Sequence, residues 1–376
     1  MEADSEARIV EAVREARERR RTLEIVGGGT RRAFGRPARC DDLLDVSANR
    51  GIASYEPEEL IVTLKPGTPL TEIERVLSEK GQRLGFDPVD WSALLGSMGA
   101  STVGGAISSD ACGSAAMRFG RARDHLLGFR AVNGFGEAYK AGGKVVKNVT
   151  GFDLPKLMCG AMGTLGVLSE VTFRVFPKSP LSSTFALQGL DAREGFALLR
   201  KVWSSPLDAT GLAFADGTAL VRLEGEKHPL AEKIAMLRMF AAGFEEIENG
   251  DARFRAIGNG AAFVATPFDV WLLSLPPAQA ARVALEIDAP LWLGDRAGQT
   301  LWIGASPGDL RSIERLCVAS ASAGGHATLL RADERSRARI AVFAPEEPAR
   351  AALTRAVKTA FDPLALLNPG RMYEGI

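Results

Sequence analysis

Residues 23–32 read LEIVGGGTRR, an apolar run that ends in three glycines and two arginines. A strand that runs into such glycines presents main-chain N–H groups without Cβ obstruction, which is the geometry of an anion-binding nest. Arg31 and Arg32 add positive charge beside it. The turn therefore suits a diphosphate, although its spacing matches neither the GxGxxG fingerprint nor a P-loop. The alternative is a tight or flexible turn that binds nothing.

Two further glycine-rich segments follow in the first half of the chain. Residues 96–120 read GSMGASTVGGAISSDACGSAAMRFG, and residues 147–173 read KNVTGFDLPKLMCGAMGTLGVLSEVTF. Interleaved glycines and hydroxyl side chains allow close backbone approach and offer hydrogen-bond donors, whereas the alternative for each segment alone is a packed Gly/Ala turn. Three such segments in one domain predict an extended ligand that is held by backbone.

Composition excludes several classes of protein. The chain has 376 residues, and its 46 Lys and Arg balance 46 Asp and Glu, so it lacks the basic field that nucleic-acid binding requires. The four cysteines lie far apart, which excludes a disulfide scaffold. The N-terminus lacks the apolar stretch of a signal peptide, and no run is apolar enough to span a bilayer. We expect a cytoplasmic protein that meets the inner membrane only indirectly, through partner subunits.

The pattern changes after residue 177. A period-2 stretch, VLSEVTFRVF, begins at Val167 and stops at Pro177 and Pro180, where a central strand cannot continue. Beyond this point a strand, helix, hairpin and helix occur twice, with turn signals at 216–217 and 296–298. This repeat predicts two ferredoxin-like βαββαβ units that share a sheet. Residues 348–360 form an amphipathic helix pattern, and the apolar tail FDPLALLNPGRMY after it is expected to dock.

The glycine-rich segments, in their order, also resemble a known family. VGGGT, STVGGAISSDACGS…RFGRARDHLLG, KNVTGFDLPKLMCGAMGTLGVLSEVTFRVFP and FDPLALLNPGRMY are similar to the FAD-binding oxidoreductases of the vanillyl-alcohol oxidase type, which have the PCMH fold. The resemblance covers roughly residues 20–180 and the last fifteen. Within the family, GAMGTLGV, GGHATLLR at 324–331 and the short second domain are most similar to the GlcE-type subunits of glycolate oxidase.

The resemblance implies an α+β fold with three parts. Residues 1–178 would form a two-subdomain PCMH-type FAD-binding domain. Residues 181–347 would form a smaller cap domain with an antiparallel sheet and helices, which agrees with the ferredoxin-like units expected above. Residues 348–376 would form a helix and tail that dock on the FAD domain.

The resemblance also implies which residues bind FAD. The glycine turn would hold the pyrophosphate, the second and third segments would line the rest of the cofactor, and the tail would return near the flavin. The implied residues are Gly27, Gly28, Gly29, Thr30, Gly99, Ser101, Thr102, Gly104, Gly105, Gly113, Gly163, Thr164, Gly166, Val167 and Asn368.

The chain departs from the family at three places. Members that bind FAD covalently have a His where Thr30 stands, so the resemblance implies non-covalent FAD. Phe152 replaces a tyrosine, which removes any hydroxyl role there. The HxGDGNxH-like stretch of the 2-hydroxy-acid dehydrogenases is absent, so we expect no metal site. His326 and Arg331 are the candidate base and carboxylate clamp, and the alternative for His326 is an ordinary surface position.

These observations predict an FAD-binding subunit of a glycolate (2-hydroxy acid) oxidase or dehydrogenase. It would accept or relay electrons from oxidation of a glycolate-like acid to glyoxylate, together with a larger FAD subunit and an Fe–S subunit. One alternative is a self-sufficient FAD-dependent 2-hydroxy-acid dehydrogenase. Another is a structural subunit that retains only the FAD fold.

The threonine at position 30 gives a first testable prediction. Because a threonine hydroxyl does not form the flavin linkage that a histidine forms, acid precipitation of the purified yellow protein should release FAD into the supernatant. The visible absorption of supernatant and pellet checks this. A yellow pellet would mean covalent attachment.

Overall fold

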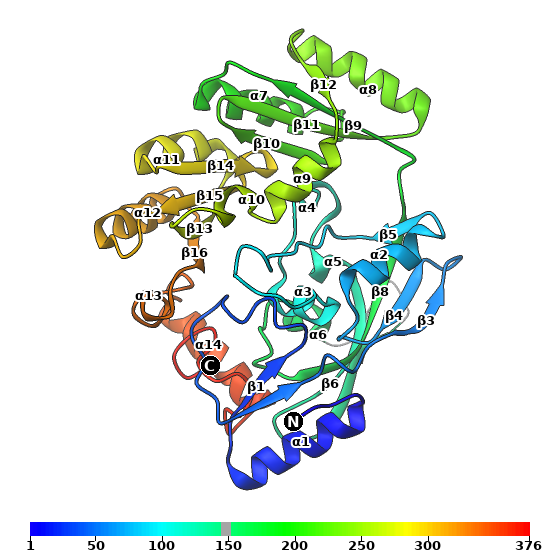
Figure 1. Ribbon diagram of the computed structural model, residues 1–376, viewed down its shortest axis with the longest axis vertical. Coiled ribbons are helices and arrows are strands. Elements are labelled where there is room, and N and C mark those ends of the chain that lie inside the picture. The colour runs from blue at the N-terminus through cyan, green and yellow to red at the C-terminus, as the bar shows by residue number, and fades with distance from the viewer. Residues whose placement is uncertain (144–151) are drawn as a thin grey trace. The chain divides into compact units, whose positions relative to one another are not determined.

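The computed structural model describes residues 1–143 and 152–376, and the chain forms two compact units (Figure 1). Unit 1 comprises residues 1–112, 120–178 and 345–376, and unit 2 comprises residues 113–119 and 179–344. The first residues of the third glycine-rich segment lie outside the described residues. The expected α+β class is confirmed.

Unit 1 contains a six-stranded sheet and a separate parallel pair, β1 with β2. The larger sheet has the order β3-β4-β8-β6-β7, and β5 also pairs with β8. The strands are β1 (Leu23–Val26), β2 (Asp42–Asp45), β3 (Ile52–Glu56), β4 (Ile61–Leu64), β5 (Gln82–Leu84), β6 (Leu126–Val132), β7 (Ala138–Gly142) and β8 (Val167–Pro177). Since β8 is buried at most positions, both of its faces are covered.

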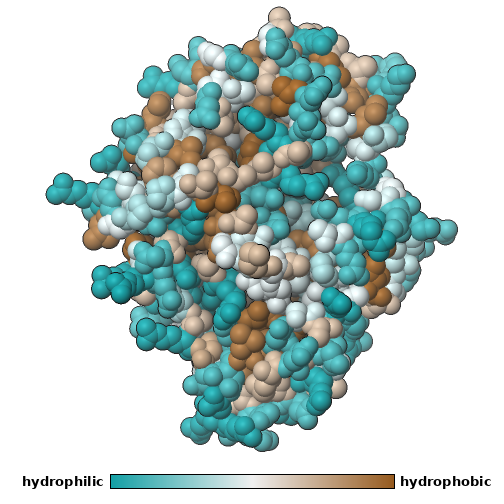
Figure 2. Space-filling model, viewed as in Figure 1, coloured by the Kyte–Doolittle hydropathy of each residue, from teal (hydrophilic) through white to brown (hydrophobic). Residues whose placement is uncertain are grey.

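The helices of unit 1 cover this sheet and the parallel pair. They are α1 (Glu6–Arg19), α2 (Leu70–Ser78), α3 (Val103–Ser109), α5 (Ala122–His125), α6 (Leu154–Met158) and α14 (Pro348–Phe361). Helix α1 contacts β6 and β8 and buries Ile9, Val13 and Ala16, the apolar positions expected from helical spacing. Its outer side, at the bottom of the view in Figure 2, is mainly hydrophilic.

Unit 2 is built on one antiparallel sheet of eight strands in the order β12-β9-β11-β10-β14-β15-β13-β16. Each half has the strand order 4-1-3-2 of a ferredoxin-like unit, and the two halves join edge to edge between β10 and β14. The strands are β9 (Leu181–Leu187), β10 (Gly211–Ala215), β11 (Thr218–Gly225), β12 (Glu245–Ile247), β13 (Asp269–Ser274), β14 (Leu291–Asp295), β15 (Thr300–Ala305) and β16 (His326–Arg331). The expected pair of ferredoxin-like units is confirmed.

Turn chemistry fixes both hairpins of this sheet. Asp216 and Gly217 have φ of 47° and 69°, so the β10–β11 turn uses two left-handed residues, as a type I′ turn requires. In the second half, residues 296–298 form η2 (Arg296–Gly298) between β14 and β15, all three with positive φ. These turns lie where the sequence placed them.

The helices of unit 2 pack on the sheet around one apolar core (Figure 1). Helix α11 contacts both α7 and α12, which brings the two halves together over the sheet. The helices are α4 (Ala116–Phe119), α7 (Ala192–Trp203), α8 (Lys227–Phe240), α9 (Gly250–Gly258), α10 (Ala261–Val264), η1 (Pro277–Gln279), α11 (Ala280–Ile287), α12 (Leu310–Ser322) and α13 (Glu334–Arg339).

One short segment from the first half of the sequence packs with unit 2. Residues 113–119 contain α4, and Arg118 forms an ion pair with Asp208. The Nε of Arg296 donates to the carbonyl of Gly113 at 3.1 Å. Nothing in the sequence of this segment distinguishes it from the glycine-rich stretch before it.

The C-terminal tail docks on unit 1, as expected. The main-chain N–H of Leu23 donates to the carbonyl of Leu366 at 2.7 Å, and that of Asn368 donates to the carbonyl of Leu23 at 2.9 Å. The tail thus extends the β1–β2 pair on the free side of β1.

Helix α14 packs Val357 and Phe361 against the core of unit 1, as the expected amphipathic helix would, and it also buries a charge. Its buried residue is Lys358, which exposes 3% of its surface. The ammonium group donates to Asp362 Oδ2 at 2.7 Å, to the carbonyl of Thr164 at 2.7 Å and to the carbonyl of Leu367 at 2.9 Å. Burial lowers the pKa of Lys358, against the opposing attraction of Asp362. All three N–H donors are used, so a buried charge that would otherwise destabilise the fold instead fixes the tail.

No helix within residues 1–143 or 152–376 is both long enough and apolar enough to cross a bilayer.

Removal of the buried ammonium should free the tail. Lys358→Met leaves the carboxylate of Asp362 buried without its partner, which costs about 3 kcal/mol. We expect faster hydrogen–deuterium exchange in peptides covering residues 361–376. Arg355→Met, one turn earlier on the exposed side of α14, is the matched control and should exchange like the wild type. Equal exchange in both variants would contradict this role for Lys358.

Candidate functional site

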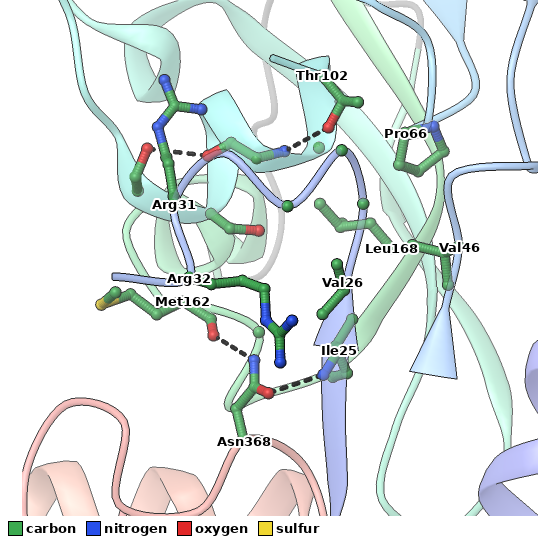
Figure 3. Close-up of a pocket in the computed structure, with 18 of the residues that line it drawn as sticks. Ile25, Val26, Arg31, Arg32, Val46, Pro66, Thr102, Met162, Leu168 and Asn368 are labelled. Atoms are coloured by element: carbon green, nitrogen blue, oxygen red, sulfur yellow. Dashed lines mark hydrogen bonds between the residues drawn. The ribbon is translucent and has the colours of Figure 1, made fainter. Parts of the chain in front are cut away.

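A pocket in unit 1 lies where β1, α3, the 162–168 segment and the C-terminal tail meet (Figure 3). Its walls combine glycine backbone and hydroxyl side chains with apolar side chains such as Val46, Met162 and Leu168. The lining residues include Ile25, Val26, Gly27, Gly28, Gly29, Thr30, Arg31, Arg32, Val46, Pro66, Thr102, Gly104, Gly105, Ser108, Ser109, Met162, Gly163, Gly166, Val167, Leu168, Asn368 and Arg371.

The first glycine turn packs closely against a second loop. A Cβ on Gly28 would lie 1.7 Å from the carbonyl oxygen of Ala100, and a Cβ on Gly99 would lie 1.7 Å from the carbonyl oxygen of Gly28. Gly29 has φ of 73°, which favours glycine. Glycine at 28 and 99 therefore allows two backbones to touch, and only Gly28 of these two also lines the pocket.

Helix α3 presents its first turn to the pocket. Thr102 is its N-cap, and the hydroxyl accepts from the N–H of Gly105 at 3.3 Å. A Cβ on Gly104 would lie 2.8 Å from Pro66, so glycine is needed for this close packing. Ser109, one turn later, donates its hydroxyl hydrogen to the carbonyl of Gly105 at 2.8 Å.

The carboxamide of Asn368 joins the tail to two other walls of the pocket. Its Oδ1 accepts from the N–H of Ile25 at 2.8 Å, and its Nδ2 donates to the carbonyl of Met162 at 2.7 Å (Figure 3). A Cβ on Gly163 would lie 2.6 Å from Nδ2. Asn368 itself has φ of 43°, a conformation that asparagine tolerates better than most residues. The residue therefore positions both β1 and the 162–163 turn.

A buried cation lies at one wall. Arg31 exposes 9% of its surface, donates through Nη2 to the carbonyl of Val89 at 2.7 Å, and lies 5.7 Å from the ring centre of Trp91. Burial lowers the pKa of Arg31 to about 10, although Asp90 opposes this. Nε and Nη1 are buried and have no acceptor among the residues that the structure describes.

The neighbouring charges are already paired. Arg32 forms two hydrogen bonds to the carboxylate of Glu24, at 2.8 and 2.5 Å, and this pair raises the pKa of Arg32. Arg371 donates to the carbonyls of Arg31 and Arg32 at 2.9 and 2.8 Å and so holds the end of the glycine turn. Of the arginines among the described lining residues, Arg31 is the one with buried nitrogen atoms that lack an acceptor.

Eleven of the expected cofactor residues line this pocket: Gly27, Gly28, Gly29, Thr30, Thr102, Gly104, Gly105, Gly163, Gly166, Val167 and Asn368. Four do not. Ser101 hydrogen-bonds to Asp90 at 2.7 Å, the Thr164 hydroxyl donates to the carbonyl of Ala161 at 2.7 Å, Gly99 supports Gly28, and Gly113 belongs to unit 2.

The candidate catalytic pair lies in unit 2, on β16. His326 is exposed at the first residue of the strand, and Arg331 is at its last residue. The guanidinium of Arg331 donates to the carbonyls of Phe263, Thr266 and Phe268 at 2.6–2.9 Å. A strand rises about 3.3 Å per residue, so the two side chains start roughly 16 Å apart. They do not form one constellation, and Arg331 holds the loop before β13.

The remaining histidines and Phe152 have the surroundings of ordinary packed or surface residues. His125 is buried with its ring edge-on to Phe176, and His228 is exposed beside Glu232. Phe152, at the expected tyrosine position, exposes 90% of its surface. Among the described residues, no group of three or more His, Cys, Asp or Glu is arranged to hold a metal ion.

Several lining residues were missed by sequence reasoning. Arg31 carried a signal, because it directly follows the glycine turn, but its burial could not be foreseen. Ile25 and Arg371 lie in stretches that the sequence singled out, the strand before the glycine turn and the C-terminal tail, but no pattern marked the residues themselves; Pro66 carried no signal at all.

The pocket fits a dinucleotide with a diphosphate. It offers close backbone approach at its glycines and hydroxyls at Thr102, Ser108 and Ser109. Such donors are those that phosphate oxygens prefer.

The contact between the glycine turn and residues 99–100 gives a prediction. In Gly28→Ala the new Cβ would collide with the Ala100 carbonyl, so the two loops must separate, and we expect a lower FAD content after purification. Gly143→Ala is the matched control, because nothing lies within 4 Å of the added Cβ. FAD per chain is measured from the absorption of released flavin. Equal content in both variants would show that loop contact does not shape the site.

Known proteins that resemble this chain in sequence or structure agree with the assignment of this pocket to FAD. A sequence model of the FAD binding domain family matches residues 1–142. The glycolate oxidase subunit GlcE of Escherichia coli is 32% identical over 99% of this chain and 98% of its own length. Glycolate oxidase subunit GlcD of Bacillus subtilis is 28% identical over 55% of this chain and 43% of its own length. A solved alkyldihydroxyacetonephosphate synthase has the same fold, with a TM-score of 0.73 at 14% identity, over 98% of this chain and 76% of its own.

The fold, the pocket and full-length similarity thus agree on an FAD-dependent oxidoreductase. The chain belongs to the PCMH-type FAD-binding oxidoreductase family, which includes the glycolate oxidase subunit GlcE.

Proposed function

We propose that this chain is the FAD-binding subunit of a glycolate (2-hydroxy acid) oxidase or dehydrogenase complex. It accepts or relays electrons from the oxidation of glycolate to glyoxylate. The observation that carries the proposal is the 32% identity to E. coli GlcE across 99% of this chain, which includes both units. By contrast, the relatives named D-2-hydroxyglutarate dehydrogenase and D-lactate dehydrogenase match half of the chain or less.

In this proposal residues 1–178 act as the FAD-binding domain, 181–347 as the cap, and 348–376 as the docked helix and tail. When bound, FAD supplies the capacity to accept a hydride and to pass electrons on. The chain itself binds and orients the cofactor. The glycine turn and α3 supply main-chain and hydroxyl donors, and Asn368 keeps β1 and the 162–163 turn at a fixed separation. Thr30 offers no nitrogen for flavin attachment, which supports non-covalent binding.

Oxidation of a 2-hydroxy acid also needs a base for the hydroxyl proton and a cation for the carboxylate. The sequence lacks the HxGDGNxH-like stretch of the self-sufficient enzymes, and the donors of Arg331 are used on main-chain carbonyls. We therefore assign these steps to a larger FAD subunit of the complex and the exit of electrons to an Fe–S subunit.

Purification of the tagged chain from its own cells tests the proposal. We expect a larger flavoprotein and an Fe–S protein to accompany it. Anaerobic glycolate should bleach the flavin absorption of the complex and leave the flavin of the isolated chain oxidised. D-lactate and D-2-hydroxyglutarate, offered in parallel, test whether glycolate is preferred.

Each alternative gives a different result. Bleaching of the isolated chain by glycolate would indicate a self-sufficient dehydrogenase, and loss of that bleaching in His326→Ala would identify its base. A chain that assembles without FAD, in a complex that still oxidises glycolate, would indicate a structural subunit.

A further inference from the structure

Residues 368–372 of the C-terminal tail run from one wall of the pocket to another, and we call them the strap. At its start, the carboxamide of Asn368 is hydrogen-bonded to β1 and to the 162–163 turn (Figure 3). Three residues later, the guanidinium of Arg371 donates to two main-chain carbonyls at the end of the glycine turn, and its own carbonyl accepts from the N–H of Arg36 at 2.9 Å. Both side chains line the pocket and expose at most 8% of their surface. The strap therefore links walls that are distant in sequence.

The strap has a firm anchor before it and little packing at its centre. Leu366 and Leu367 are buried, and the carboxylate of Asp362 accepts from both of their N–H groups, at 3.0 and 2.8 Å. By contrast, Pro369 and Gly370 are half-buried, and no atom of the described residues lies within 4 Å of a Cβ added at Gly370. The strap is therefore held by polar contacts at its two ends rather than by packing along its length.

The backbone of the strap is a tight turn. The N–H of Arg371 donates to the carbonyl of Asn368 at 3.2 Å, which closes the four-residue turn Asn-Pro-Gly-Arg. Pro369 occupies its second position, and Gly370 occupies its third with φ of 73°, as is typical of a type II turn. A residue with a Cβ adopts this φ only at a cost, so the turn depends on glycine at position 370.

We propose that the strap closes over bound FAD, and that FAD enters and leaves the pocket when the strap opens. Opening breaks the hydrogen bonds of Arg371 and Asn368 and leaves the buried leucines before the strap in place. Local openings of this kind require much less free energy than global unfolding. Cofactor exchange is thus limited by the strap and not by unfolding of unit 1. The inference rests on FAD binding by this chain and is independent of the proposed substrate and partners.

Gly370→Ala tests the strap without removing a side-chain contact. Because alanine destabilises the closed turn, we expect FAD release about five- to tenfold faster than in the wild type. The rate is measured from the rise in flavin fluorescence after dilution of the FAD-loaded protein. Gly375→Ala is the matched control, because position 375 has φ of 79°, has no described atom within 4 Å of an added Cβ, and lies beyond the strap. It should release FAD at the wild-type rate.

Association rates separate a gate from a fixed wall of the pocket. FAD crosses a gate in both directions, so Gly370→Ala should speed association and release by similar factors and leave the dissociation constant nearly unchanged. Faster release with unchanged association would show that the strap is a wall that contacts FAD. Equal release from Gly370→Ala and Gly375→Ala would show that the strap does not control exchange. Either result would overturn the proposal.

Hydrogen–deuterium exchange gives a readout that depends on neither flavin fluorescence nor activity. We expect peptides covering residues 368–376 to exchange more slowly in the FAD-loaded than in the FAD-depleted protein, and Gly370→Ala to speed their exchange in both. Exchange that does not respond to FAD would also refute the gate. Strap kinetics as expected in a complex that does not oxidise glycolate would count against the proposed function alone, whereas glycolate oxidation with FAD release unaltered by Gly370→Ala would count against this inference alone.

Discussion

The FAD pocket depends on the return of the C-terminal tail to β1. Main-chain hydrogen bonds join Leu23 to Leu366 and to Asn368 in the tail. The carboxamide of Asn368 also donates to the carbonyl of Met162 and accepts from the N–H of Ile25. Because β1 ends directly in the glycine turn, these bonds set where that turn lies relative to the 162–168 segment. Three segments that are distant in sequence are thereby held in register by one side chain and a short stretch of backbone.

Among the buried cations of unit 1, Lys358 and Arg31 have opposite hydrogen-bonding states. Lys358 has three donors and three acceptors, one of them a carboxylate, so its charge is compensated inside the protein. Arg31 exposes 9% of its surface, yet two of its donor atoms have no acceptor among the described residues. The two buried charges therefore differ in how far the chain itself satisfies them.

Much of the fold could be predicted from the sequence because local chemistry specified it. Asp216 and Gly217 dictate a two-residue hairpin, and the repeat of this pattern with flanking helices gives the ferredoxin-like halves of unit 2. The pocket was predictable where glycines allow close backbone approach. Arg31 and Lys358 were not, because burial of a charge depends on tertiary partners that no local pattern encodes. The packing of residues 113–119 with unit 2 was unpredictable for the same reason, because Asp208, the ion-pair partner of Arg118, is distant in sequence.

That segment also ties the pocket helix to unit 2 through the chain itself. Helix α3 lines the pocket up to Ser109, and residue 113 already packs in unit 2. The connecting residues, Asp110 to Cys112, are buried, and Asp110 is held in a left-handed conformation by Arg121, whose guanidinium bonds both its carboxylate and its carbonyl. The covalent connection between the pocket helix and the segment that packs in unit 2 is therefore three buried residues long, and it is held by hydrogen bonds within unit 1.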